Sequence, residues 1–351
     1  MQCNLYVCFL HRTCTAKSNR YSLHIREPSL RGSLNFSRQN ILGRPKMRKN
    51  RYYRRMEEIT EEDYKNFAIQ KNEIVQIDGN KKYKIRIGEK RTIRDLQPQN
   101  FVPETTTVWS FPNRGNWATH KGDFRGNFAP QIPRNLILKY SKIGETVLDP
   151  MCGSGTTLIE CKLLERNGIG VDINYEYVIL TRDRLHFDLD SPNKETWQRT
   201  FVGDARNLNL IQSESVDLIV THPPYASIIP YSSEVEGDLS KIRDVDEYLE
   251  EMKVVASECY RILKPNRYCC ILIGDTRRHG QYVPIAFKVM QVFLNTNFLL
   301  KEDIIKHQWQ CKSTPYWLEK SIKHNFLLIM HEHIFVFRKP KRNEILLHPY
   351  E

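Results

Sequence analysis

The chain lacks the long apolar segment that would mark a membrane protein. None of its apolar runs approaches the roughly 18 to 20 residues that a spanning helix needs. The first ten residues, MQCNLYVCFL, are apolar but carry no positive leader and no small-residue cleavage site, so a signal peptide is not expected. With 351 residues, 40% of them hydrophobic, the sequence predicts one large domain or two modest ones.

Cysteine spacings typical of a metal site or a disulfide framework are also absent. The nine cysteines are scattered, and no two of them have the C-x-x-C spacing of a zinc site. Their number is odd, which disfavours a complete set of disulfides. The sequence therefore predicts no metal centre and a protein of the reducing cytoplasm.

Acidic residues are scarce in the first sixty positions. This part holds 13 lysines and arginines against three glutamates, which accounts for +10 of the net charge of +12. Its densest stretch, GRPKMRKNRYYRRM, has the composition of a segment that contacts phosphates and stacks tyrosines on bases. A solvated, disordered tail would have the same composition. A third alternative is that translation starts at Met47 or Met56.

Beyond this segment the apolar pattern alternates between strands and helices. In the region 58–104, Thr60 is expected to cap a helix, and residues 81–93 alternate as a strand does. From about residue 105 the expected strands are 145–149, 169–173, 200–205, 217–221, 268–275, 298–308 and 332–338, and the expected helices are 156–168, 174–185, 244–263 and 283–295. This alternation predicts an α/β fold with a doubly wound, mainly parallel sheet. The last two strands have no helix between them and are expected to form an antiparallel hairpin at the edge.

A glycine-containing turn follows the first of these strands. In VLDPMCGSGTTLIE, residues 147–160, the strand ends at Asp149, and the chain passes through Gly153 and Gly155 into a helix at Thr156. Glycines let the backbone approach a ligand closely, and a helix start presents free amide hydrogens. A P-loop is excluded because no Gly-Lys-Ser/Thr follows, and the three-glycine dinucleotide fingerprint is absent. The turn therefore predicts a site for another nucleotide-like cofactor.

Three successive strands end in aspartate. Asp149 ends the first, Asp172 the second and Asp204 the third. Because the carboxyl ends of parallel strands meet at one edge of a sheet, these side chains are expected to converge on one ligand. A carboxylate at Asp172 suits two ribose hydroxyls, and one at Asp204 suits an adenine amine. The pattern predicts an adenosyl-shaped ligand.

The motifs DPMCGSGTT and THPPY together resemble those of the S-adenosylmethionine-dependent amino-methyltransferases of DNA. The similarity is greater to the branch that methylates the exocyclic N4 amine of cytosine in restriction-modification systems. The segments 108–137 and 261–287 are similar to the same branch, so the resemblance spans roughly residues 105–340. It implies a Rossmann-like methyltransferase fold with a seven-stranded sheet, S-adenosylmethionine as cofactor and double-stranded DNA as partner.

The resemblance also implies a set of site residues and a domain layout. Residues 1–57 are expected to be a basic tail, 58–104 a small mixed region, 105–340 the catalytic domain with recognition insertions near 226–243 and 308–326, and 341–351 a tail. The cofactor-binding residues are expected to be Asp149, Pro150, Gly153, Ser154, Gly155, Thr156, Asp172, Ile173, Asp204, Ala205, Phe128 and Pro130.

The stretch His222-Pro223-Pro224-Tyr225 is the expected catalytic motif. An exocyclic amine is a poor nucleophile because its lone pair is delocalised into the ring, so the enzyme must accept hydrogen bonds from it. A rigid Pro-Pro turn supplies a backbone carbonyl at a fixed place, and Tyr225 is expected to stack on a base flipped from the duplex. His222 stands where the family usually has Asp, Asn or Ser. A neutral imidazole can accept through one ring nitrogen.

Two further segments are candidates for DNA contact. GDTRRHG, residues 274–280, follows a buried strand and is expected to bring Arg277 and Arg278 to phosphates, although a solvated basic loop has the same composition. Residues 308–326 interleave lysines with aromatic residues, and Lys312, Tyr316 and Trp317 are the expected contacts there.

Several functions stay open at this point. The favoured hypothesis is cytosine-N4 methylation of a specific DNA sequence, which protects it from a cognate restriction endonuclease, by an enzyme of the prokaryotic cytoplasm associated with the nucleoid. The alternatives are adenine-N6 methylation of DNA, guanine-N2 methylation of RNA, and a non-catalytic nucleic-acid-binding protein.

Overall fold

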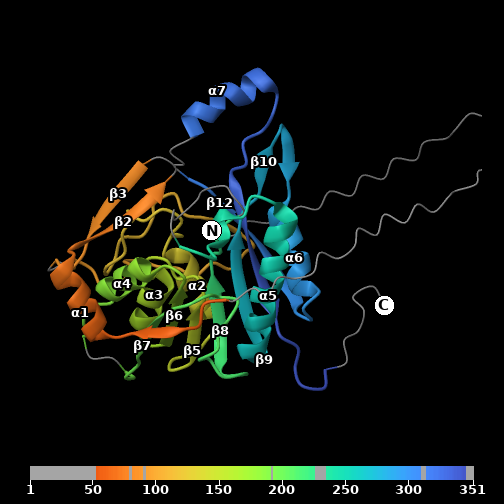
Figure 1. Ribbon diagram of the computed structural model, residues 1–351. Coiled ribbons are helices and arrows are strands. Elements are labelled where there is room, and N and C mark those ends of the chain that lie inside the picture. Colours follow the sequence, from red (N-terminus) through yellow and green to blue (C-terminus); the bar gives the residue numbers. More distant parts are fainter. Residues whose placement is uncertain are drawn as a thin grey trace, which may run out of the picture. The chain divides into compact units, whose positions relative to one another are not determined.

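A nine-stranded sheet forms the centre of the fold (Figure 1). The computed structural model describes residues 53–78, 81–89, 92–190, 193–225, 235–309 and 314–344. In sheet order the strands are β1 (Glu57–Ile59), β7 (Gln198–Val202), β6 (Asn167–Asp172), β5 (Thr146–Asp149), β8 (Val216–Thr221), β9 (Leu263–Ile273), β13 (His331–Arg338), β12 (Leu299–His307) and β4 (Val108–Ser110). The five strands from β7 to β9 are mutually parallel, and β1 and β13 are antiparallel to their inner neighbours.

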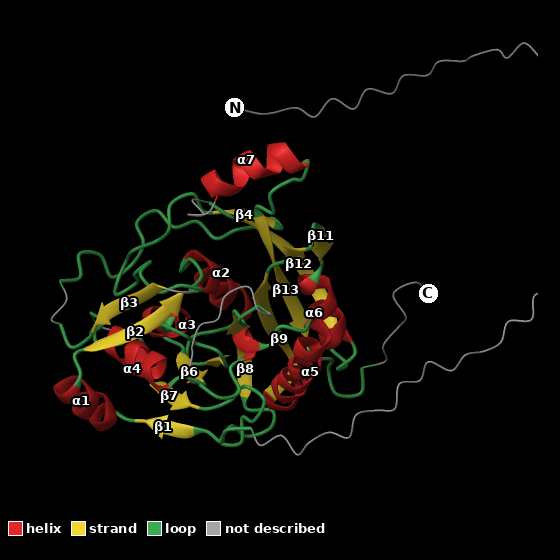
Figure 2. Cartoon of the chain, turned by 45° about the horizontal axis from the view of Figure 1, so that its top comes forward, coloured by secondary structure: helices red, strands yellow, loops and turns green. Residues whose placement is uncertain are grey.

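Helices cover both faces of this sheet. The described helices are α1 (Glu61–Gln70), α2 (Gln131–Tyr140), α3 (Thr156–Leu163), α4 (Tyr175–Arg184), α5 (Val245–Ile262), α6 (Ile285–Leu294) and α7 (Thr314–His324), with a 3-10 turn, η1, at Leu239–Lys241. Two small hairpins, β2 (Glu73–Asp78) with β3 (Lys81–Arg86) and β10 (Thr276–Arg278) with β11 (Gln281–Val283), lie outside the sheet. Figure 2 shows α7 apart from the other helices, beyond β4.

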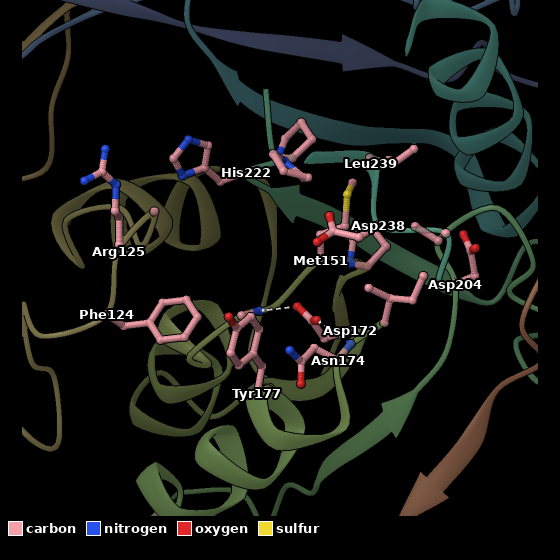
Figure 3. Close-up of a pocket in the computed structure, with 18 residues that line it drawn as sticks. Phe124, Arg125, Met151, Asp172, Asn174, Tyr177, Asp204, His222, Asp238 and Leu239 are labelled. Atoms are coloured by element: carbon pink, nitrogen blue, oxygen red, sulfur yellow. Dashed lines mark hydrogen bonds between the residues drawn. The ribbon is translucent and has the colours of Figure 1, made fainter. Parts of the chain in front are cut away.

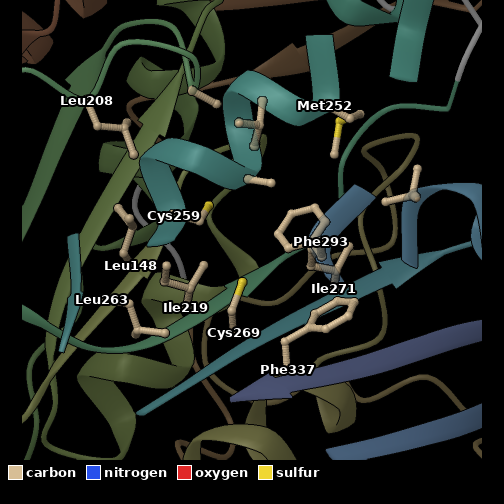
Figure 4. Packing of buried hydrophobic residues seen from close by; sticks show 14 of the residues in the cluster. Leu148, Leu208, Ile219, Met252, Cys259, Leu263, Cys269, Ile271, Phe293 and Phe337 are labelled. Carbon is tan, nitrogen blue, oxygen red and sulfur yellow. The ribbon is translucent and has the colours of Figure 1, made fainter. Parts of the chain in front are cut away.

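The alternation of side chains along the strands divides the core into two layers. Leu148 and Ile219 face α5 and α6 in one cluster (Figure 4), whereas their neighbours Val147 and Leu218 pack with α2 on the opposite face. Every residue of β8 is buried. A strand buried on both faces does not need polar alternation, which explains the apolar run Leu218–Val220 at its centre.

The predicted fold class is confirmed, with corrections at its edges. The sheet has nine strands rather than seven, because the three-residue strands β1 and β4 are added at its two ends. The antiparallel pair β12–β13 is present, but it is not at the edge, since β4 pairs with β12, and the expectation of no helix between the two strands is wrong, since α7 connects them. The helix predicted to run to 168 ends at Leu163, and the glycine at 168 belongs to β6 instead.

The residues just before position 60 also differ from the prediction. Residues 53–57 were expected to be part of the tail, yet β1 begins at Glu57 and pairs with β7. The backbone N–H of Met56 also donates to Asn209 at 2.9 Å. Thr60 caps α1 as predicted, in a reciprocal capping box with Asp63. The basic residues at 1–52 lie outside the described residues.

Membrane-spanning helices and clusters of metal ligands are both absent from the described part of the chain. There, no helix is both long and apolar enough to span a membrane. The same residues contain no group of three His, Cys, Asp or Glu side chains placed to hold a metal ion.

Candidate active site

The turn after β5 is organised by Asp149. Its carboxylate accepts hydrogen bonds from the Thr157 hydroxyl at 2.6 Å and from the Met151 amide at 3.1 Å. Gly155 caps α3 in the left-handed region, with φ of 82°. A Cβ there would lie 2.7 Å from Cγ2 of Thr181, so both the backbone and the space require glycine. Asp149 is buried and therefore shapes the turn from beneath.

Asp172, at the end of β6, lies beside this turn. Its carboxylate accepts from the backbone N–H groups of Gly153 and Asn174, each at 2.9 Å. Burial raises the pKa of Asp172 to about 7 against these hydrogen bonds, and the carboxylates of Asp238 and Asp149 add to the rise. Asp172 thus links the glycine turn to the start of α4 while one edge of its carboxylate borders a pocket.

This pocket lies at the carboxyl ends of the parallel strands (Figure 3), where doubly wound sheets bind their ligands. It is lined by Phe124, Arg125, Gly126, Pro150, Met151, Gly153, Asp172, Ile173, Asn174, Tyr177, Asp204, Ala205, His222, Pro223, Pro224, Gly237, Asp238 and Leu239. Carboxylates and backbone amides alternate in it with apolar side chains. A lining of this kind fits an adenosyl group, which has hydroxyls, an amine and a flat apolar face.

Asp204 is in the lining but already has strong partners. Both of its carboxylate oxygens accept from Arg206, at 2.8 and 2.6 Å, and Arg206 also contacts Glu251 at 2.5 Å. The Arg206 guanidinium lies 4.6 Å from the ring centre of Tyr53. The backbone N–H of Arg206 donates to the same carboxylate at 2.9 Å, and since a carboxylate has about four lone-pair sites, Asp204 retains capacity for one further donor. Its position is therefore fixed by a buried ion pair that the sequence analysis did not anticipate.

Half of the predicted cofactor residues line the pocket. These are Pro150, Gly153, Asp172, Ile173, Asp204 and Ala205, whereas Asp149, Ser154, Gly155, Thr156, Phe128 and Pro130 are not part of the lining. The upstream segment does reach the pocket, but through Phe124, Arg125 and Gly126. Tyr177 was also missed; it lies in the first turns of α4 and packs edge-on against Phe124 at 4.8 Å. Its place shortly after Asp172 was the only signal in the sequence.

The predicted catalytic motif joins the same pocket. His222, Pro223 and Pro224 line it, whereas Tyr225 lies behind the lining. Nε2 of His222 lies 2.8 Å from the Tyr225 hydroxyl, which in turn donates to Glu332 on β13 at 2.8 Å. The ring of Phe128 meets the imidazole edge-on, with centres 5.7 Å apart. The motif and the glycine turn therefore line one cavity, and the tyrosine hydroxyl is held by Glu332.

Burial and the neighbouring charges set the ionisation of His222. Burial lowers the pKa of His222, and Lys306 adds to this, while Glu332 and the Gly126 backbone act in the opposite direction. Burial would raise the pKa of Glu332, but Lys306, His222 and the hydrogen bond from Tyr225 hold it down, to about 2. Lys306 donates to Glu332 at 2.9 Å. The imidazole is therefore neutral at pH 7 beside an ionised carboxylate.

The residues predicted to contact DNA lie on two elements away from the pocket. Arg277 and Arg278 are on β10, so the expected loop is a hairpin; Arg277 lies over the rings of Tyr282 and Phe326, and Arg278 donates to the Arg243 carbonyl at 2.6 Å. On α7, Tyr316 and Trp317 are 61% and 44% exposed. Lys312 lies outside the described residues, as do positions 226–234 of the first predicted insertion.

Sequence comparisons with known proteins agree with this geometry. The chain is 38% identical over 110 residues to the tRNA (guanine(10)-N2)-dimethyltransferase of Methanothermobacter thermautotrophicus. These residues make up 30% of each chain. It is 33% identical over 104 residues to the type II methyltransferase M.HpaI of Haemophilus parainfluenzae, 29% of this chain and 32% of that one. The chain thus matches about a third of the length of these curated relatives.

Structural and family comparisons extend over more of the chain. An S-adenosylmethionine-dependent methyltransferase of Methanosarcina mazei covers 59% of this chain and 97% of its own, with 14% identity and a TM-score of 0.41. A model of the RMKL-like methyltransferase domain matches residues 136–242. The DNA methylase family model matches residues 12–183 and 216–351. On this match, which covers most of the sequence, the chain belongs to the DNA methylase family of N6 and N4 methyltransferases, and its cofactor is S-adenosylmethionine.

Proposed function

We propose that the chain methylates the exocyclic N4 amine of cytosine in a specific sequence of double-stranded DNA. The observation that carries this proposal is the single pocket that Asp172 and the His222-Pro223-Pro224 turn share. One end has the carboxylate and amides suited to an adenosyl group. The other has a rigid turn with acceptors suited to an amine. A donor and a nucleobase amine bound there would meet at short range.

Different residues bind the cofactor and the target amine. S-adenosylmethionine supplies an electrophilic methyl group when bound. We assign to the Asp172 carboxylate the orientation of the cofactor through its ribose hydroxyls, and to the Pro223 carbonyl and a ring nitrogen of His222 the hydrogen bonds from the target amine. Accepting these hydrogen bonds makes the amine lone pair available for transfer without a covalent enzyme intermediate. This division fits an amine target rather than a ring carbon.

Two elements outside the pocket have features that support a nucleic-acid substrate. On α7, a lysine lies against two exposed aromatic rings: Lys320 Nζ is 4.1 Å from the ring centre of Tyr316 and 5.1 Å from that of Trp317. Arg277 and Arg278 on β10 add positive charge. We assign base contact to α7 and phosphate contact to the hairpin and to the basic residues of 1–57. A cognate endonuclease and a place in the prokaryotic cytoplasm, at the nucleoid, belong to the same proposal.

Two related functions differ from the proposed one in the base that is methylated. The same pocket would accept adenine for N6 methylation, and the missing Asp at the head of the motif is our reason for placing cytosine first. A guanine-N2 target in RNA is the second candidate, because two relatives of 38% and 34% identity are tRNA (guanine(10)-N2)-dimethyltransferases.

The test incubates the full chain with methyl-labelled S-adenosylmethionine and either genomic DNA or total tRNA. Hydrolysis and mass spectrometry of the nucleosides then identify the product. We expect N4-methylcytosine from DNA and no labelled nucleoside from tRNA. N6-methyladenine would move the target to adenine, and N2-methylguanosine from tRNA would replace the proposal with the RNA function.

A further inference from the structure

The family motif does not account for the groups behind His222. The imidazole, the Tyr225 hydroxyl, the Glu332 carboxylate and the Lys306 ammonium form one continuous chain, with successive contacts of 2.8, 2.8 and 2.9 Å. Glu332 is 107 residues from Tyr225 in sequence, and it comes from β13 while Lys306 comes from β12. A buried carboxylate and a partly buried ammonium are costly unless they are paired and hydrogen-bonded, as these two are at 2.9 Å.

The protons of this chain define which nitrogen of His222 is an acceptor. Tyr225 has a single hydroxyl hydrogen, and the ionised Glu332 carboxylate is a stronger acceptor for it than a neutral imidazole. The tyrosine oxygen can then only accept from His222, so the proton of the neutral ring is on Nε2. Nδ1 is left with a lone pair. It is buried and makes no hydrogen bond with the residues that the structure describes, and the Gly126 backbone near the ring favours its protonated form.

We propose that Tyr225, Glu332 and Lys306 are positioning residues that hold His222 as an Nδ1 acceptor and stabilise it after it takes a proton from the target amine. This inference rests on the proposed function, because it assigns Nδ1 to the substrate amine. Phe128 holds the ring from its edge, and Glu332 supplies the countercharge for an imidazolium.

The proton balance of the step is complete with these groups. The amine nitrogen bonds to the methyl carbon, the sulfur–methyl bond breaks, and its electron pair stays on sulfur, which becomes a neutral thioether. The positive charge is now on the amine, which loses one proton to Nδ1 of His222. The imidazolium donates through Nε2 to Tyr225 and thereby to the field of Glu332, and it returns the proton to water after the product leaves.

Glu332 and Lys306 should act on the pH profile in opposite directions. His222 must be neutral to accept, so the rate falls on the acid side as the imidazole becomes protonated. Glu332 raises the pKa of His222 and Lys306 lowers it. Glu332→Gln should therefore move the acid limb to lower pH, and Lys306→Met should move it to higher pH. A loss of packing alone would not shift the limb in opposite directions.

The test measures kcat and KM for methylation as a function of pH in the wild type, Glu332→Gln, Lys306→Met and Tyr225→Phe, with cofactor affinity measured in parallel. We expect opposite shifts in the first two variants, and a fall in plateau kcat of at least about tenfold in Glu332→Gln and Tyr225→Phe. Cofactor affinity should stay unchanged. Shifts that are absent or of the same sign, with kcat retained, would overturn the inference.

A second measurement does not depend on turnover. Imidazole ¹⁵N shifts, with the His222 signal assigned by its loss in His222→Asn, report the tautomer directly. We expect the proton on Nε2 in the wild type, and a change of this state in Tyr225→Phe. A proton on Nδ1 in the wild type would contradict the positioning role. An inactive wild-type enzyme on every DNA tested would instead reject the proposed function, so the two failures are distinguishable.

Discussion

Asp172 is the side chain on which cofactor binding depends most. It borders the pocket, and its carboxylate is held in place by two backbone amides. Replacing a charged acceptor removes hydrogen bonds of about 1.5 to 3 kcal/mol. Asp172→Asn should therefore weaken S-adenosylmethionine binding by roughly tenfold to a hundredfold. Isothermal titration calorimetry measures this, with His222→Ala as the control that should retain affinity. Equal losses in the two variants would contradict the division of roles.

The ionisation of Asp172 also gives cofactor binding a pH dependence. Burial raises its pKa to about 7, and the ionised form is the one that accepts two hydroxyl hydrogens. As pH falls below 7 the carboxyl becomes protonated, so affinity should decrease by up to about tenfold per unit. Titrations between pH 5 and 8 test this. The slope should disappear in Asp172→Asn; a slope that persists in this variant would assign it to another group.

The sequence identified the residues at strand ends and missed those brought in by other elements. Asp172 and His222 were found because the first ends an apolar strand, the second directly follows one, and both precede a turn signal. Glu332 was not, since it lies within a strand whose pairing with β9 cannot be read from local pattern. Phe124 and Tyr177 reach the pocket from segments without a distinctive spacing.

The turn between β5 and α3 depends on its second glycine. Gly155 has φ of 82° and no room for a Cβ beside Thr181, whereas Gly280 in the β10–β11 hairpin has φ of 77° and nothing within 4 Å. Gly280→Ala should cost about 1 to 3 kcal/mol from backbone strain alone. Gly155→Ala adds a steric clash and should cost more. Chemical denaturation compares the two; equal costs would exclude a role for the clash.

The residues just before the short strand β1 support the cofactor pocket from outside it. Tyr53, just before β1, lies under Arg206, which in turn holds Asp204, and Arg54 donates to the carbonyl of Ile173 at 3.3 Å. Three-residue strands such as β1 and β4 carry too little pattern to be recognised in the sequence. This explains why residues 53–57 were assigned to the tail and why two strands were missed.

A pair of truncations tests this support. A chain that starts at Met56 loses Tyr53 and Arg54, whereas one that starts at Met47 retains them. A cation–π contact of about 0.5 to 2 kcal/mol corresponds to a roughly two- to thirty-fold effect. We expect weaker cofactor binding by calorimetry in the Met56 chain only. Unchanged binding in both would show that Tyr53 and Arg54 do not support the pocket.

Binding of DNA should separate into two contributions of different physical origin. Tyr316 and Trp317 on α7 would stack on bases, which is worth about 1 to 3 kcal/mol per base and depends little on salt. The basic residues of 1–46 would contact phosphates and release counterions. The double variant Tyr316→Ala, Trp317→Ala should lower affinity at an unchanged salt slope. Removal of residues 1–46 should flatten that slope. Fluorescence anisotropy over a range of salt concentrations distinguishes the two contributions. The same salt slope with and without residues 1–46 would show that the basic segment does not contact phosphates.

The central claim is that one pocket brings the methyl donor to an amine held by His222. The most direct measurement maps methylated bases by single-molecule sequencing of DNA from cells that express the wild type, Asp172→Asn or His222→Ala. We predict N4-methylcytosine at one recurrent sequence with the wild type and its loss in both variants. The same methylation pattern in His222→Ala would contradict the account.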